Sequence, residues 1–65
     1  MNTYIVRANL TEIAIVYNCE SHSEAINTAL NKLYNENYDL WLKFSDYEWL
    51  AEKIYYRKNV VELLI

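Results

Sequence analysis

The sequence predicts an α+β fold in which a small antiparallel sheet packs on one amphipathic helix. Three observations predict it: two alternating segments lie close together near the start, a helical apolar pattern follows them, and strand-like segments return near the end. The sheet is therefore expected to combine an N-terminal hairpin with C-terminal strands. A chain of 65 residues fits one compact domain, residues 1–65.

The first expected element is a β-hairpin. Residues 3–8 and 12–18 alternate in polarity, and the link Asn9-Leu10-Thr11 is short enough for a hairpin turn. The alternation assigns these side chains to the core face: Tyr4, Val6, Ala8, Ile13, Ile15 and Tyr17. Ile5 and Val16 then lie on the second face, which is not fully polar and is open to another chain.

Asparagine is expected to take the role of glycine in the turns. The chain contains no Gly and no Pro, and Asn is the best remaining residue for left-handed backbone positions. Asparagines lie between the apolar segments, at Asn9, Asn18, Asn35, Asn37 and Asn59. We interpret these positions as turns.

An amphipathic helix of about three to four turns follows the hairpin. Ser21 and Glu24 are three residues apart and form a capping box, which marks the start of a helix. Apolar residues then recur at helical spacing, at Ala25, Ile26, Ala29, Leu30, Leu33 and Tyr34. Polar residues lie between them, so one face of this helix is predicted to pack on the sheet.

Two interpretations are open for the second half of the chain. In the first, residues 39–44 form a third strand, Ser45 and Glu48 cap a second short helix that ends at Asn59, and residues 60–65 form the last strand. In the second, residues 57–59 turn a hairpin instead of ending a helix. Periodicity does not separate the two, because Tyr and Ile also favour strands.

The residue types required for catalysis or metal binding are almost absent. Cys19 and His22 have the spacing of two metal ligands, but a structural zinc site needs four and no second pair exists. The lack of Gly excludes phosphate-binding loops and nucleophile elbows. We therefore expect no enzyme activity, no cofactor and no metal.

Charge and hydropathy indicate a cytoplasmic protein. The longest apolar run, Ile13 to Tyr17, is far shorter than the ~20 residues that a membrane span needs, and the N-terminus shows no signal-peptide pattern. The single free cysteine agrees with a reducing compartment. The 9 acidic and 6 basic residues give a net charge of -3, which disfavours nonspecific binding to nucleic acid.

Aromatic and acidic residues cluster between positions 36 and 52. A small core holds some large rings, but five rings within twelve residues are too many to bury together, and exposed Trp and Tyr are typical of protein interfaces. We therefore expect a partner-binding surface, suited to a basic protein, formed by Tyr38, Asp39, Trp41, Asp46, Tyr47, Glu48, Trp49 and Glu52.

Two alternative functions remain open. A small nucleic-acid-binding regulator would use a basic and aromatic cluster of Lys53, Tyr55, Tyr56, Arg57 and Lys58. A structural subunit of a homo-oligomer, with a homodimer as its simplest form, would cover Ile5 and Val16 with its own copy. Self-association or a partner is expected because a core this small supplies only roughly 3–5 kcal/mol.

The chain resembles small proteins encoded by phages and mobile elements, notably inhibitors of bacterial defence such as anti-CRISPR proteins. The resemblance is one of type. It rests on the small size, the frequent Asn, Tyr, Ile and Lys, and the strand–strand–helix opening from Tyr4 to Tyr34. It implies a non-catalytic inhibitor that binds a host defence effector, such as a CRISPR nuclease complex, in the bacterial cytoplasm. It assigns no role to any residue.

Overall fold

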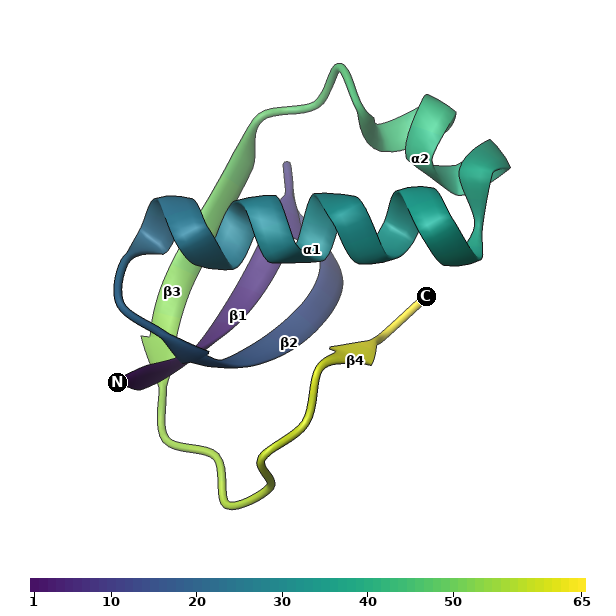
Figure 1. Cartoon of the computed structure of the whole chain (residues 1–65). Helices are drawn as coiled ribbons and strands as arrows, with labels where there is room; N and C mark the ends of the chain where they lie inside the picture. Colours follow the sequence, from purple (N-terminus) through teal and green to yellow (C-terminus); the bar gives the residue numbers. More distant parts are fainter.

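The computed structural model describes residues 1–65 and contains a four-stranded antiparallel sheet with two helices on one side (Figure 1). The elements follow one another as β1 (Asn2–Ala8), β2 (Thr11–Cys19), α1 (His22–Glu36), α2 (Tyr38–Phe44), β3 (Trp49–Ile54) and β4 (Glu62–Leu63). The order across the sheet is β3-β1-β2-β4. The α+β fold and the sheet built from an N-terminal hairpin and C-terminal strands are thus as predicted.

The hairpin of β1 and β2 contains a β-bulge. Val6 pairs with Ala14, but Arg7 pairs with Glu12, so Ile13 is an extra residue on β2. A bulge of this kind shifts the alternation of the strand by one residue. Ile13 and its neighbour Ala14 are consequently both fully buried.

The bulge corrects the predicted faces of β2. Val16 lies opposite Tyr4 and is fully buried beneath α1, whereas we expected it on the second face. Ile15 and Tyr17 lie on that second face instead, and Ile15 pairs with Ile5 there. The outer face of the sheet is therefore partly apolar, as expected, but the residue beside Ile5 is Ile15.

Two of the five asparagine turns adopt the left-handed conformation. Asn9 has φ 53° and Asn18 has φ 62°, values that most side chains disfavour. Asn9 also fastens the hairpin turn to the end of the sheet, because its Oδ1 accepts the N–H of Glu48 at 3.0 Å. The prediction is wrong for Asn35, which lies inside α1.

Helix α1 starts where the capping box predicts. Ser21 Oγ accepts the Glu24 N–H at 3.1 Å, and Glu24 Oε2 accepts the N–H of Glu20 at 2.9 Å. The helix lies across one face of the sheet (Figure 1), on which it buries Ala25, Ala29 and Leu33. The two alanines allow the helix to approach the strands closely.

The predicted strand at residues 39–44 is wrong, because this segment forms helix α2. Asn37 caps it, since its Oδ1 accepts the N–H of Leu40 at 3.2 Å. Asp39 in the first turn and Lys43 in the last turn complement the helix dipole. The apolar residues of this segment also have helical spacing, and Phe44 reaches the core.

The predicted helix after residue 45 is also wrong, because residues 49–54 form strand β3. The second capping box does not form: Ser45 Oγ donates to the carbonyl of Leu42, and the Glu48 N–H donates to Asn9. β3 instead pairs antiparallel with β1 along its whole length. β2 pairs with one edge of β1 and leaves the other edge free. Residues 49–54 form a strand because they pair with that free edge.

The alternative hairpin around residues 57–59 is wrong as well. β3 and β4 lie at opposite edges of the sheet, and β4 pairs with β2 through Ala14 and Ile15. The expected last strand at residues 60–65 exists, although only Glu62–Leu63 form it. The connecting residues 55–61 loop around the lower end of the sheet (Figure 1).

Candidate interaction surface

The structure separates the eight residues of the predicted surface into three locations. Tyr38, Asp39 and Trp41 belong to α2, whereas residues 46–49 form the turn into β3 and its first residue. Glu52 lies on the outer face of the sheet. Only the residues on α2 form a cluster of exposed aromatic and acidic side chains.

Three rings meet where α1 ends and α2 begins. The ring of Tyr34 contacts Tyr38 and Trp41 edge-on, at centroid distances of 5.2 and 5.0 Å. Tyr38 and Trp41 stack at 5.5 Å. Tyr34 and Tyr38 nevertheless remain 50% and 49% exposed, so the cluster is preorganised by its own contacts and still available at the surface.

A single residue between the helices brings these rings together. The backbone N–H of Asn37 ends α1 by donating to the carbonyl of Leu33 at 2.8 Å, and its side chain starts α2. Its extended backbone (φ -153°) reverses the chain direction without any loop. Tyr34 in the last turn of α1 is consequently adjacent to the first turn of α2.

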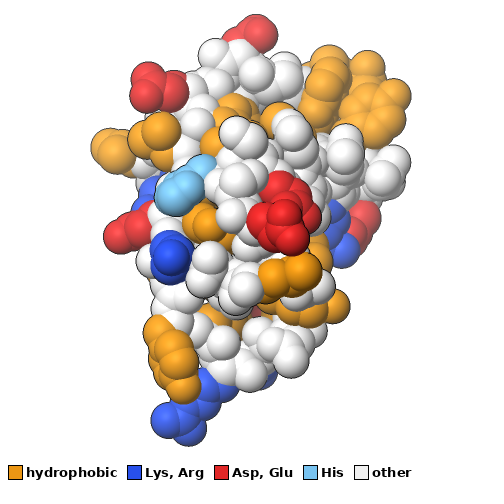
Figure 2. All heavy atoms as spheres, turned by 60° about the vertical axis from the view of Figure 1, so that its left-hand side comes forward, with side chains coloured by type: hydrophobic (Ala, Val, Ile, Leu, Met, Phe, Trp, Pro, Cys, Tyr) orange, Lys and Arg blue, Asp and Glu red, His pale blue; other side chains and the backbone are white.

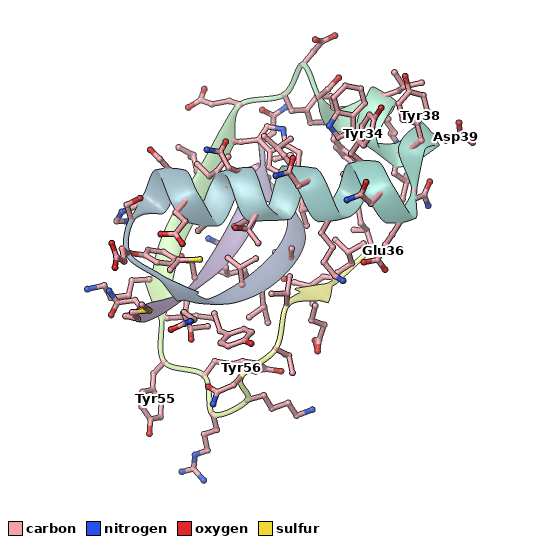
Figure 3. All side chains as sticks on the ribbon, in the orientation of Figure 1. Tyr34, Glu36, Tyr38, Asp39, Tyr55 and Tyr56 are labelled. Atoms are coloured by element: carbon pink, nitrogen blue, oxygen red, sulfur yellow. The ribbon has the colours of Figure 1, made fainter.

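The carboxylate of Asp39 borders the rings (Figure 3). Glu36 forms an ion pair with Lys32. Asp39 is exposed and forms no ion pair. We call the group of Tyr34, Tyr38, Asp39 and Trp41 the aromatic–acidic patch. Figure 3 shows Tyr34, Tyr38 and Asp39 side by side at this end of the molecule, with Glu36 apart from them below the end of α1.

The rings of Tyr47 and Trp49, in the turn into β3 and at its start, pack against the core. Tyr47 packs edge-on against buried Phe44 at 5.0 Å, and the Trp49 indole N–H donates to the Phe44 carbonyl at 2.8 Å. Both rings are only partly exposed. Asp46 and Glu48, on either side of Tyr47, are exposed, but they lie in the turn and outside the aromatic–acidic patch.

Glu52 takes part in an ion-pair network on the outer face of the sheet. Arg7 Nη1 donates to Glu52 Oε1 at 2.7 Å, and Arg7 Nη2 lies 3.4 Å from Glu12 Oε2. The hydrogen bond and charge of Glu52, with a smaller effect of Glu12, raise the pKa of the Arg7 guanidinium. Glu52 is therefore not adjacent to the patch on α2.

Tyr34 is the residue that the sequence pattern misplaced. Its spacing in α1 fits the core face, and the structure leaves it half exposed beyond the end of the sheet. No helical spacing identifies it, because Asn37 interrupts the helix between Tyr34 and Tyr38.

A second exposed group lies in the loop between β3 and β4. Tyr55 is 91% exposed and is followed by Arg57 and Lys58, which are exposed and form no ion pair. Figure 2 shows basic and hydrophobic side chains together at the lower end of the molecule, where this loop lies. Tyr56 is partly buried.

The remaining reactive side chains have structural contacts. Cys19 is buried, and this burial raises the pKa of its thiol. His22 contacts the Tyr4 ring edge-on at 4.9 Å. No three metal-ligating side chains lie together, and the surface has no pocket. Neither helix is long and apolar enough to cross a membrane.

Comparisons of the chain with protein-family models, curated proteins and solved structures found no match.

Proposed function

We propose that the protein is a non-enzymatic inhibitor or modulator that binds a partner protein through the aromatic–acidic patch. The observation that carries the proposal is the cluster of Tyr34, Tyr38 and Trp41, which is ordered by ring contacts and whose two tyrosines are half exposed. Ordered aromatic side chains lose little conformational entropy on binding, which is why Tyr and Trp dominate interface energetics.

The charge of the patch indicates the chemistry of the partner. Asp39 forms no ion pair, so a partner that presents Lys or Arg there would pair with it and be steered toward the rings. The resemblance to small phage-encoded inhibitors suggests a bacterial defence effector with a nucleic-acid-binding surface, such as a CRISPR nuclease complex. Such a protein would act in the cytoplasm of the bacterial host.

The test compares the wild type, one double variant and one single variant in affinity capture from a bacterial lysate. The double variant Tyr34→Ala/Tyr38→Ala removes both half-exposed rings, and Tyr55→Ala removes the most exposed tyrosine outside the patch. We expect the wild type and Tyr55→Ala to retain one stoichiometric partner. We expect the double variant to bind it about 30-fold or more weakly, the effect of losing an interface hot spot.

Unfolding curves of all three proteins distinguish a loss of binding from a loss of fold. The proposal is contradicted if the folded double variant keeps the partner with unchanged affinity. It is equally contradicted if Tyr55→Ala loses the partner and the double variant does not.

The basic loop supports a second candidate function, in which the protein binds single-stranded nucleic acid. Tyr55 provides an exposed ring for stacking, and Arg57 and Lys58 are free of ion pairs. If this function is correct, a labelled oligonucleotide will bind at low salt, and its affinity will fall steeply as salt rises. Tyr55→Ala and Arg57→Ala should weaken the binding, while Tyr38→Ala should not. The absence of binding at low salt would eliminate this candidate.

A further inference from the structure

The sheet ends in one long open edge. β3 is the outermost strand and pairs with β1 over all six of its residues without a bulge. The opposite edge carries only the two-residue strand β4, a common way to protect an edge. No proline interrupts β3, because the chain contains none.

The pairing with β1 determines which backbone groups of β3 remain free. The Asn9 N–H donates to the Glu48 carbonyl at 2.7 Å, in line with the register that pairs Ala8 with Trp49. Hydrogen-bonded pairs alternate along an antiparallel ladder, so Leu50, Glu52 and Ile54 bond to β1. The N–H and C=O groups of Trp49, Ala51 and Lys53 consequently point away from the sheet.

We propose that this edge binds a second copy of the chain, with β3 antiparallel to β3 of the copy and Ala51 on the two-fold axis. The proposal is independent of the aromatic–acidic patch. In this register Ala51 faces Ala51 of the copy, Lys53 faces Trp49 and Glu52 faces Leu50. The sheet would thereby become continuous through both copies.

Charge selects this register among the neighbouring ones. A shift of two residues in one direction places Glu52 opposite Glu52 of the copy, and the same shift in the other direction places it opposite Glu48. A larger shift places Lys53 opposite Lys53. Like charges directly opposite one another destabilise a strand pair, and only the Ala51-centred register avoids all of them.

The side chains fit this register on both faces. Lys53 is exposed and has no ion pair, and it would lie beside the aromatic ring of Trp49 of the copy, an attractive cation–π arrangement. On the outer face Leu50 is 56% exposed and would be covered. The two Glu52 side chains become diagonal neighbours, and each already forms an ion pair with its own Arg7.

The first test measures the mass of the protein in solution from micromolar to millimolar concentration. We expect the mass to rise with concentration from 7.8 kDa to twice this value. Ala51→Pro should raise the dimer dissociation constant at least about tenfold, because it removes an N–H that points outward and leaves the β1 ladder intact. A wild type that stays monomeric throughout would overturn the proposal, even if a different protein were found to bind this edge.

The second test measures the register by cross-linking under mild oxidation. Paired residues at the two-fold axis have Cα atoms about 5.5 Å apart, within the range of a disulfide. Ala51→Cys should therefore yield a covalent dimer. Lys53→Cys should not, because the two Lys53 positions lie about 13 Å apart along the strands.

The wild type provides the baseline for this measurement, since its only thiol is buried. Cross-linking of Lys53→Cys in preference to Ala51→Cys would overturn the Ala51-centred register, and cross-linking of neither variant would overturn the strand pairing.

Discussion

Val16→Lys is expected to abolish cooperative folding, whereas Ile15→Lys is expected to leave a folded protein. Val16 is fully buried beneath α1, so a lysine there places an unpaired charge in the core and costs more than about 3 kcal/mol. Ile15 lies on the outer face directly opposite Glu62, where a lysine gains an oppositely charged neighbour. Thermal unfolding followed by circular dichroism measures both effects.

The comparison of these neighbours tests the bulge at Ile13. Strict alternation from residue 12 puts Ile15 in the core and Val16 outside, which predicts the opposite result. A cooperative transition for Val16→Lys together with an unfolded Ile15→Lys would therefore show that the bulge is absent.

Phe44→Ala is expected to destabilise the protein by about 3–5 kcal/mol, which is comparable to the total stability of a chain this short. Phe44 is the buried residue of α2, its ring packs against Tyr47, and its carbonyl accepts the Trp49 indole N–H. Its removal leaves a cavity where α2 joins the core. Chemical denaturation monitored by tryptophan fluorescence measures the change in free energy of unfolding.

Leu42→Ala is the matched control, because Leu42 belongs to the same helix and is 51% exposed. We expect its unfolding free energy to stay within about 0.5 kcal/mol of the wild type. Equal effects of the two substitutions would contradict the assignment of Phe44 as the anchor of α2.

Much of the N-terminal half was predictable because its signals are local. The alternation of β1, the turn at Asn9 and the capping box of Ser21 and Glu24 each lie within a few residues, and each is confirmed. The bulge at Ile13 was not predictable in the same way. It depends on which residues of β1 and β2 face one another, and that information is not contained in either strand alone.

The second half was harder because its apolar residues satisfy two patterns. Residues 39–44 read as a strand by composition, but the Asn37 cap and the burial of Phe44 favour a helix. Residues 49–54 satisfy a helical pattern, but β1 offers them an unpaired edge. In residues 49–54 long-range pairing outweighs local propensity, as is usual for β-prone residues, whereas the cap of residues 39–44 is itself local.

The sequence predicted that an exposed aromatic and acidic surface exists, but it identified only some of the residues that form it. The excess of aromatic and acidic residues beyond position 36 indicated that some rings would be exposed, and Tyr38 is half exposed. Whether a given ring was core or surface could not be predicted. Trp49 and Tyr47 contact Phe44, while Tyr34 joins Tyr38 because Asn37 folds one helix back on the other.

The sequence by itself determined the α+β class, the hairpin and the first helix, since hydrophobic periodicity and capping act over a few residues. Only the tertiary structure decided which side chains of β2 face the core, that α2 is a helix and β3 a strand, and which residues form the aromatic–acidic patch. The strands depend on contacts between segments, such as Asn9 with Glu48 across 39 positions, and the patch depends on the chain reversal at Asn37. A local pattern shows where apolar side chains occur along the chain. The segments that pack against them decide whether each one faces the core or the solvent.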